Sequence, residues 1–441
     1  MSVRYARQEA LSGWDQERLS GATLGIAGSG IMAFLCAWMA AAMGFGRLVL
    51  LHGGAAQRLD QLFSGAVDPV GGWSWESFFG RVNPRVKVYA CPLRLHSRLV
   101  GRLPDLDGLI VAGNDTEALM AGEEVARKSA FPVVGGVAAG PLGAWGPARV
   151  NRLTAPFCGS PESPLVGQII SGLLVEEIRK GLLPLFGEGG SAEEVGLLRL
   201  GPRKEQEKER SVALLARRHS IAMVGAGALG TWFGWALGLS GLAIRLNIYD
   251  DDRVDETNLN RQVLFYDAVD QPKAPTLAAR LQAFFPRLAL TGYGLRVEED
   301  CEDSLASKSI LAACPDSFSV RALLNGWAQR HRRALLSGGT SAFGGTCAVY
   351  EPGKTACLSC RFDIDRLAER EQQPESCGRV PEASVVTSNA ITGALMVLAL
   401  LEMLGGHVPM GVWEYDGSAQ ERRIDHRSPR PACGCHRRGM V

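Results

Sequence analysis

Residues 221–230 read IAMVGAGALG. An apolar run leads into Gly225 and another follows Gly230, which is the pattern of a buried β-strand, a glycine turn and a helix. Glycines at such a turn let the backbone approach a phosphate, and the N–H groups of the first helical turn bind its charge. Gly225, Gly227 and Gly230 therefore predict a nucleotide site, in a pattern that fits NAD, FAD or ATP.

The same pattern occurs a second time, near the start of the chain. Residues 24–30 read LGIAGSG, again an apolar strand and a glycine turn before an apolar run. Two later segments, 163–183 and 383–404, also match each other, because each passes from small residues into an amphipathic or buried helix. Residues 187–210 are rich in glycine and then in charge, which is typical of a linker.

From this internal repeat we predict an α/β protein of two tandem Rossmann-like domains with mostly parallel sheets. The boundary is expected near residue 190, so the domains are 1–190 and 191–441. The length of 441 residues suits such a division. Lys and Arg total 47 and Asp and Glu 46. This balance gives no electrostatic footprint for nucleic acid or for an anionic membrane, so neither is expected as a partner.

Cysteine usage and the N-terminal residues bear on the cellular compartment. The chain has 11 cysteines, with a CxxC and a CxC pair among unpaired thiols. The first residues, MSVRYARQEALSGWDQERL, are charged and lack the apolar core of a secretory signal. Both features indicate a reducing compartment, and we expect a cytoplasmic protein.

Residues 24–46 carry no charge and are long enough to span a bilayer. The alternative is a buried strand, a glycine turn and a buried helix. We favour that alternative because the glycines fall where a strand-to-helix turn needs them. A second apolar stretch, 394–404, is interrupted by Glu402 and is expected to be too short to span.

Polar residues after the second strand distinguish between the nucleotides. Residues 243–252, AIRLNIYDDD, end in carboxylates, and an Asp such as Asp250 can bind ribose hydroxyls. An NAD-dependent oxidoreductase has no need for Asn258, Arg261 and Lys273 directly afterwards. One amide and two cations suit a triphosphate, because they stabilise charge on the α-phosphate and on departing pyrophosphate. The alternative is a solvated charged loop.

These residues resemble an adenylation domain of the ThiF-MoeB type, which ubiquitin-activating enzymes share with the adenylating enzymes of molybdopterin and thiamine biosynthesis. The family pattern is GxGxxG, Asp-x-Asp, Asn-Leu-x-Arg-Gln and Pro-Lys. This chain has GAGALG, Asp250-Asp251-Asp252, Asn258-Leu259-Asn260-Arg261-Gln262 and Pro272-Lys273. The resemblance implies that the glycines, Asp250 and Asp252 bind the nucleotide. It also implies that Asn258, Arg261 and Lys273 contact the phosphates.

The family also has an Asp after a later strand that helps to bind magnesium. The matching residue is Asp316, in ILAACPDSFSVRALLN (310–325). Pro315 and Ser317 stand where the family usually has Thr and Asn. Arg321 follows at the spacing that the family shows.

Four cysteines form two close pairs, Cys357 with Cys360 and Cys433 with Cys435. Four thiolates suit a closed tetrahedral zinc site of the structural kind. The resembling family has paired knuckles at these places, with CxxC as the usual second pair. The tighter CxC leaves His436 as an alternative ligand, and redox-active thiols are the other interpretation.

Cys377 stands alone in a polar loop with Gly and Pro, between the first cysteine pair and the apolar helix expected at 385–404. An exposed thiolate can attack an acyl-adenylate, so Cys377 is the candidate nucleophile. The flanking residues resemble the crossover loop of the family, where the conjugating or sulfur-accepting cysteine lies. The alternative is an incidental loop cysteine.

The first half resembles a degenerate copy of the same domain. Residues 4–8, RYARQ, match the family's N-terminal segment, in which the second arginine reaches the partner subunit's nucleotide, and this is Arg7 by position. Residues 48–57, LVLLHGGAAQ, hold no carboxylate, and Asn114-Asp115 only faintly echoes the metal-binding Asp. We expect an inactive pseudo-adenylation domain that forms a pseudo-dimer with the second half.

The whole pattern predicts an enzyme that uses ATP and Mg²⁺ to adenylate the C-terminal carboxylate of a ubiquitin-like protein. Cys377 then captures it as a thioester for handover to a conjugating enzyme. A chain this compact resembles bacterial activating enzymes encoded with ubiquitin-like proteins. The nearest alternative is adenylation of a sulfur-carrier protein or a ribosomal peptide without a conjugation cascade. A catalytically inactive scaffold and an NAD-dependent oxidoreductase are the alternatives from other classes.

Overall fold

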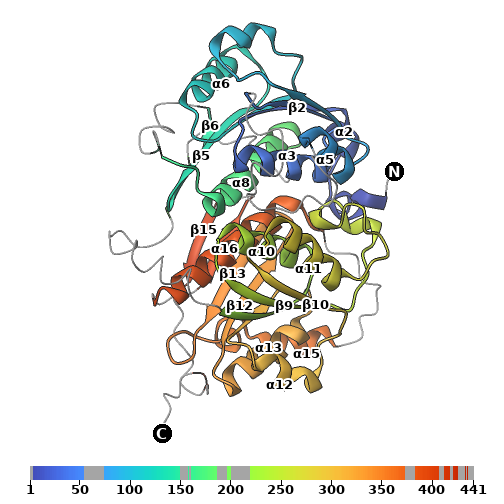
Figure 1. Cartoon of the computed structure of the whole chain (residues 1–441), viewed down its shortest axis with the longest axis vertical. Helices are drawn as coiled ribbons and strands as arrows, with labels where there is room; N and C mark the ends of the chain where they lie inside the picture. Colours follow the sequence, from blue (N-terminus) through green and yellow to red (C-terminus); the bar gives the residue numbers. More distant parts are fainter. Residues whose placement is uncertain are drawn as a thin grey trace.

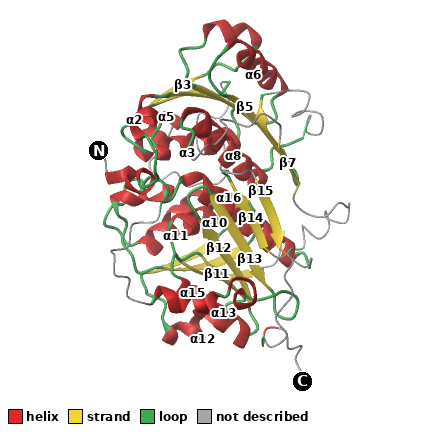
Figure 2. Ribbon diagram, turned by 180° about the vertical axis from the view of Figure 1, so that it is seen from behind, coloured by secondary structure: helices red, strands yellow, loops and turns green. Residues whose placement is uncertain are grey.

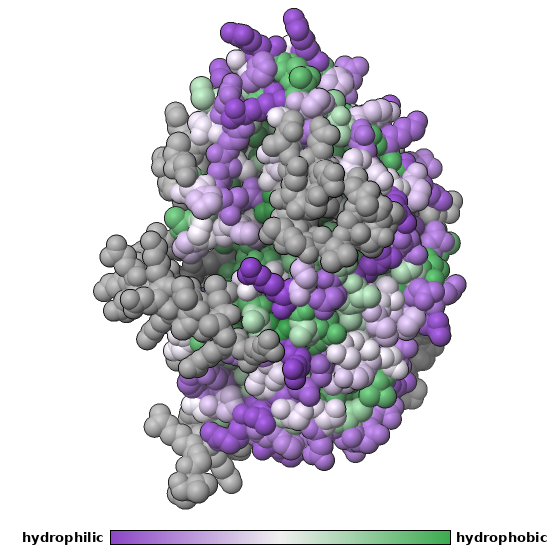
Figure 3. All heavy atoms as spheres, in the orientation of Figure 1, coloured by the Kyte–Doolittle hydropathy of each residue, from purple (hydrophilic) through white to green (hydrophobic). Residues whose placement is uncertain are grey.

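The chain folds into two α/β units, one above the other in Figure 1. The computed structural model describes residues 3–53, 74–148, 157, 160–185, 196–199, 219–372, 383–406, 412–417, 421–425, 433 and 435. Among the residues coloured in Figure 3, polar ones predominate toward the top and bottom, and an apolar area lies at mid-height, where the units meet.

The first unit is a seven-stranded sheet with helices on both faces. Its strands are β1 Thr23–Ala27, β2 Arg47–Leu51, β3 Lys87–Cys91, β4 Gly108–Ala112, β5 Val133–Ala139, β6 Leu142–Pro147 and β7 Gly196–Arg199. Its helices are η1 Val3–Tyr5, α1 Ala6–Glu9, α2 Gln16–Gly21, α3 Ile31–Met43, α5 Trp75–Val82, η2 Ser97–Arg102, α6 Thr116–Lys128 and α8 Pro164–Leu182.

The second unit has an eight-stranded sheet, and Figure 2 shows the edge that ends in strands β14 and β15. Its strands are β8 His219–Val224, β9 Ile244–Tyr249, β10 Ala289–Tyr293, β11 Ile310–Ala313, β12 Ala334–Thr340, β13 Gly344–Tyr350, β14 Val412–Asp416 and β15 Glu421–Asp425. Its helices are α10 Ala228–Leu239, η3 Glu256–Asn258, η4 Val263–Phe265, α11 Lys273–Phe284, η5 Glu299–Cys301, α12 Glu302–Ala306, α13 Phe318–Arg330, α14 Leu358–Phe362, α15 Ile364–Glu371 and α16 Val386–Leu404.

The two sheets share one strand order. The first runs β3-β2-β1-β4-β5-β6-β7, and the second runs β10-β9-β8-β11-β12-β13-β14 before adding β15. In each sheet the first five strands of this order are parallel and the rest are antiparallel. The prediction of two Rossmann-like units with mostly parallel sheets is confirmed. The strand order reverses between β8 and β11, and open α/β sheets bind ligands at such a point.

The apolar stretch at 24–46 folds as strand, turn and buried helix. Strand β1 is buried throughout, and every residue of α3 after Ile31 is buried. Helix α16 is longer than the 394–404 segment that we expected to be too short to span a membrane. It runs for 19 residues, and its length and apolar composition would allow it to cross one. However, 83% of its apolar window is buried inside the protein, as in a core helix.

One continuous apolar core joins the two units, because helices α3, α5 and α8 face α10, α11 and α16. The rings of Trp38 and Trp235 meet edge to face with centroids 4.6 Å apart, and those of Phe78 and Phe284 with centroids 6.2 Å apart. Such aromatic pairs add to the gain from burying the rings. Gln168 also donates a hydrogen bond to the carbonyl of Ala390 at 2.8 Å across this junction.

The expected boundary at residue 190 stays a prediction. The first sheet takes its last strand, β7, from beyond that residue, and the second begins with β8. The segment 200–218 lies outside the described residues.

Candidate active site

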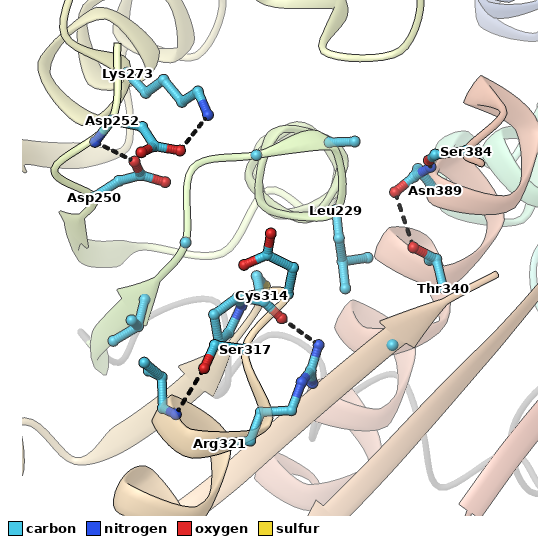
Figure 4. A pocket seen from close by; sticks show the side chains of 18 of the residues that line it. Leu229, Asp250, Asp252, Lys273, Cys314, Ser317, Arg321, Thr340, Ser384 and Asn389 are labelled. Carbon is cyan, nitrogen blue, oxygen red and sulfur yellow. Dashed lines mark hydrogen bonds and ion pairs between the residues drawn. The ribbon is translucent and has the colours of Figure 1, made fainter. Parts of the chain in front are cut away.

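A cleft of about 920 Å³ lies at the carboxyl ends of the central strands of the second sheet, beside the reversal of strand order. Its walls include ten residues that the sequence singled out: Arg7, Gly225, Gly227, Asp250, Asp252, Asn258, Arg261, Lys273, Asp316 and Arg321. In Figure 4, Asp250, Asp252 and Lys273 lie on one side of the cleft, and Thr340, Ser384 and Asn389 lie on the other. The structure brings the predicted residues together, and their individual roles stay predictions.

The glycine turn between β8 and α10 allows only glycine at two positions. Gly225 has a φ of +96°, and a Cβ there would lie 2.7 Å from the carbonyl oxygen of Cys314. A Cβ on Gly230 would lie 2.1 Å from the carbonyl oxygen of Gly225. Gly227 instead faces open space, where a Cβ would meet nothing closer than 3.8 Å. The turn is therefore closed on the sheet side and open on the cleft side, as a phosphate-binding turn requires.

Asp250 is held against this turn. Its Oδ2 accepts a hydrogen bond from the amide of Ala226 at 2.6 Å, and its Oδ1 accepts one from the amide of Asp252 at 3.0 Å. Burial raises the pKa of Asp250, although these amides and the charge of Lys273 act against the rise. A carboxylate at the end of the second strand, next to the glycine turn, is placed to accept hydrogen bonds from ribose hydroxyls.

Lys273 is the first residue of α11, and its side chain is buried although it lines the cleft. Its Nζ lies 2.7 Å from Oδ2 of Asp252 (Figure 4), and its amide donates to the carbonyl of Asp252 at 2.9 Å. Only the carboxylate of this pair is exposed, so the amino group is held at the cleft wall, where a phosphate can replace Asp252 as its partner.

Arg261 is buried beside a short 3₁₀ turn, and its Nη1 donates to the carbonyl of Thr257 at 2.6 Å and to Oδ1 of Asn260 at 2.8 Å. Asn258 closes the same turn, because its Oδ1 accepts from the amide of Asp255 at 3.0 Å. Burial and the nearby charge of Arg7 lower the pKa of Arg261 to about 10. Two guanidinium groups that repel each other at a cleft wall favour an anionic ligand.

The N-terminal segment brings Arg7 to this cleft from the first unit. The carbonyl of Arg7 accepts from the amide of Ser384 at 3.2 Å. On either side, Arg4 donates to the carbonyl of Leu259 at 3.3 Å, and Gln8 accepts from Nδ2 of Asn260 at 3.0 Å. The sequence predicted that Arg7 serves the second half, and the contacts hold its segment there.

Asp316 is an exposed carboxylate in the loop after β11, and it lines the cleft. Arg321 is buried below this loop and donates to the carbonyl of Pro315 and, at 3.0 Å, to Oγ of Ser337. Arg321, which the sequence placed at the spacing that the family shows, therefore fixes the backbone next to Asp316. An exposed carboxylate beside a candidate phosphate site is a ligand that Mg²⁺ prefers.

Sequence reasoning missed the polar wall opposite Lys273. Oγ1 of Thr340 and Oδ1 of Asn389 lie 3.3 Å apart, and Nδ2 of Asn389 donates to Oγ of Ser384 at 3.1 Å (Figure 4). The signal in the sequence is the run of small polar residues at the start of α16, an otherwise apolar helix.

Cys377, the candidate nucleophile, lies outside the described residues. Cys314 lines the cleft, but burial raises the pKa of its thiol to about 12. A thiol with that pKa stays protonated at neutral pH and is a poor nucleophile.

Cys357, Cys360, Cys433 and Cys435 meet in one cluster, at the start of α14. Their Sγ atoms lie 3.8 Å apart for Cys357–Cys360 and Cys360–Cys435, and 3.6 Å apart for Cys357–Cys433. Four sulfurs about 2.3 Å from a central zinc ion would be about 3.8 Å apart, so the cluster fits a tetrahedral zinc site. His436 lies outside the described residues.

The first unit has its own side chains at the corresponding glycine turn. Oε1 of Glu162 accepts from the amide of Met32 at 2.8 Å, at the start of α3, and burial raises the pKa of Glu162 to about 7. Asp115, the echo of Asp316, accepts from Arg94 at 2.7 and 2.6 Å. It also caps α6 through the amide of Ala118.

Comparisons with known proteins place the similarity in the second half. The model described as ThiF family matches residues 208–435. A sulfur carrier protein adenylyltransferase of Thermus thermophilus is 31% identical over 241 residues, which cover 49% of this chain and 83% of that protein. A NEDD8-activating enzyme E1 catalytic subunit of Arabidopsis thaliana is 30% identical over 180 residues, which cover 36% of this chain and 39% of that protein.

One solved structure is similar over about half of this chain. A crystal structure described as E. coli MccB + MccA-N7isoASN matches 52% of this chain and 69% of that chain, at 19% identity and a TM-score of 0.45.

Proposed function

This chain belongs to the ThiF family, and on that premise we propose that it activates a ubiquitin-like protein in two steps. A carboxylate oxygen of the partner's C-terminus attacks the α-phosphorus of ATP. The new P–O bond forms as the bond to pyrophosphate breaks, and pyrophosphate leaves. The thiolate of Cys377 then attacks the acyl carbon. A thioester forms as the bond to AMP breaks, and the acyl group is ready for a conjugating enzyme.

The observation that carries the proposal is that cations from both units line one cleft. Arg7 comes from the N-terminal segment of the first unit, whereas Arg261 and Lys273 come from the second. Positive groups fixed around a triphosphate stabilise the charge that develops on the α-phosphate and on leaving pyrophosphate. Asp316 would hold Mg²⁺, which supplies further charge neutralisation on the phosphates. The first unit then acts as the inactive partner of a pseudo-dimer within one chain.

The cysteine cluster supports a structural zinc site in the second unit. A zinc ion there would tie residues 433 and 435 to the start of α14. We expect about one zinc per chain by elemental analysis, and loss of zinc together with a lower melting temperature in Cys433→Ser. A zinc-free protein with unchanged stability would contradict the zinc site and favour redox-active thiols.

A similar protein supports an alternative substrate, a sulfur carrier protein. The Thermus thermophilus protein acts, by its name, on a sulfur carrier protein. A sulfur carrier protein would be adenylated in the same way, but it would not be passed to a conjugating enzyme. A ribosomal peptide is the other substrate of this kind. The proposed location is the cytoplasm, where the thiols stay reduced.

The test is ATP–pyrophosphate exchange with candidate ubiquitin-like and sulfur-carrier proteins, beside a non-reducing gel. We expect exchange with a ubiquitin-like protein and a reductant-sensitive adduct that is lost in Cys377→Ala. Cys301→Ala is the matched control, because Cys301 lies outside the cleft wall. Exchange without an adduct would favour the sulfur-carrier or peptide substrate. Absence of exchange with every partner would sink the proposal and favour an inactive scaffold.

A further inference from the structure

Glu371 occupies the start of helix α13, next to the candidate magnesium ligand. It is the last residue of α15, and its carboxylate accepts hydrogen bonds from the hydroxyl of Ser317 at 2.9 Å and from the amides of Ser319 at 2.8 Å and Phe318 at 3.2 Å. Burial opposes the charge of Glu371, but these donors lower its pKa below the usual range. The carboxylate is therefore ionised at neutral pH, and charge-assisted bonds of this kind are strong.

These bonds act on the loop that contains Asp316. Ser317 and Phe318 directly follow Asp316, and Glu371 holds both of them. Arg321 holds the carbonyl of Pro315 on the other side of Asp316. The backbone on both sides of the exposed carboxylate is thus fixed by charged side chains, one from α13 and one from α15.

Helix α15 is a rigid support for this contact. Its apolar side packs into the core that contains Cys357 and Cys360, through Ile364 and Leu367. Helix α14 precedes it directly and is tied to α13, because Nδ2 of Asn325 donates to Oγ of Ser359 at 2.9 Å. The cysteine cluster, α14 and α15 therefore form one packed unit that ends in Glu371.

Glu371 is also close to the end of the described segment that precedes Cys377 in the sequence. Residues 373–382, which include Cys377, lie outside the described residues, and the chain lines the cleft again at Ala383 and Ser384. The carboxylate therefore connects the candidate metal loop to α15, the last helix that the structure describes before the candidate nucleophile.

We propose that Glu371 is a positioning residue of the adenylation reaction, which fixes the Pro315–Ser317 loop so that Asp316 can bind nucleotide-bound Mg²⁺. This inference rests on the proposed function. Without the carboxylate, the first amides of α13 lose their acceptor and the loop loses one of its two anchors. Partners that orient a metal ligand typically contribute about 10- to 100-fold to metal affinity.

The test is the Mg²⁺ dependence of ATP binding, measured by calorimetry on the full chain. We expect Glu371→Ala to raise the Mg²⁺ concentration that half-saturates ATP binding by about 10-fold. Glu371→Gln should shift it less, because its amide oxygen still accepts from the backbone. ATP binding without Mg²⁺ should change little in both variants. Glu369→Ala is the matched control, an exposed acid on the same helix.

The outcomes separate this inference from the proposed function. A folded Glu371→Ala protein with the Mg²⁺ dependence of Glu369→Ala would overturn the positioning role and leave the adenylation proposal standing. A wild-type protein that binds no ATP at any Mg²⁺ concentration would overturn both. If Glu371→Ala fails to fold, Glu371→Gln and Glu371→Asp give the same comparison with a smaller disturbance.

Discussion

In the first half of the chain the glycine turn before α3 receives the carboxylate of Glu162, whereas in the second half the turn before α10 faces a cleft of about 920 Å³. The Asp after the fourth strand differs in the same way. Asp115 is paired with Arg94, but Asp316 lies exposed at the cleft wall. The sheets around the turns have the same strand order. A chain can therefore keep the fold of a nucleotide site and close it with its own charges.

The difference can be traced to single positions. The helices α8 and α16 correspond when Gly172 is aligned with Gly393, and this alignment puts Ala383 opposite Glu162. Ala383 lines the cleft of the second half. A carboxylate at this position accepts from the glycine turn in the first half, and an alanine leaves the turn of the second half without one, because a helix N-terminus binds a side-chain anion as well as a phosphate.

Replacing Arg7, the cation that the first unit contributes to the cleft of the second, should have the largest effect on activity. Arg7→Ala is expected to lower the rate of ATP–pyrophosphate exchange by about 10²- to 10³-fold, the usual loss for one preorganised charge-stabilising group. The Arg7→Ala protein should still fold, since the side chain of Arg7 lies at the cleft wall. Exposed Arg18→Ala is the control. An Arg7→Ala enzyme with the wild-type exchange rate would show that the first unit contributes no catalytic cation to the second.

Copying the closed turn into the second half should have the next largest effect. Ala383→Glu is expected to weaken ATP binding by about 100-fold, because a carboxylate would compete for the phosphate position and repel the phosphates. Ala383→Gln, of similar size and neutral, should weaken it much less. Calorimetry on the three proteins measures both. Equal affinities for the Glu and Gln variants would mean that bulk, not charge, distinguishes the halves.

The carboxylate in the first half should make stability depend on pH. The folded pKa of Glu162 is about 7 and the unfolded value about 4.5, so the folded state binds an extra proton between these values. The stability from this group is complete below pH 4.5 and is lost as pH rises through 7. The wild type should lose on the order of 2–3 kcal/mol relative to Glu162→Gln over this range.

Denaturant unfolding of wild type and Glu162→Gln at pH 4.5, 6 and 8 measures this loss. Glu298→Gln, an exposed acid of the second half, is the control. Parallel pH curves for the wild type and Glu162→Gln would show that Glu162 does not titrate as its burial implies.

Breaking the ion pair of the first half should have the smallest effect. Arg94 is 53% exposed and Asp115 30% exposed. Arg94→Ala is therefore expected to cost only about 0.2–1 kcal/mol of stability, as exposed pairs do, and to leave ATP binding unchanged. A clear loss of ATP affinity in this variant would show that the first half takes part in nucleotide binding beyond Arg7.

The sequence by itself determined the two-unit architecture and the glycine turn and charged residues of one side of the cleft. Both follow from local patterns: apolar strands ending in glycine turns, and polar residues such as Asp250 and Lys273 directly after a strand or at the start of a helix. The carboxyl ends of parallel strands meet at one edge of a sheet, so these residues come together once the topology is known. The cysteine cluster was likewise predictable, since the two members of each pair are close in sequence and each pair has the spacing of metal ligands.

Only the tertiary structure decided how charges and rings pair over long distances. Glu162 meets the amide of Met32 across 130 positions, and Glu371 meets Ser317 across 54. The residues around these glutamates do not indicate their partners in the sequence. Most of these partners are backbone amides, which every residue except proline has. The apolar junction that joins α8 to α16 was equally hidden, since a buried helix has the same composition whichever neighbour it packs against. Local patterns fix the fold of each half, whereas pairing across the fold decides which glycine turn is capped by a carboxylate of the chain itself.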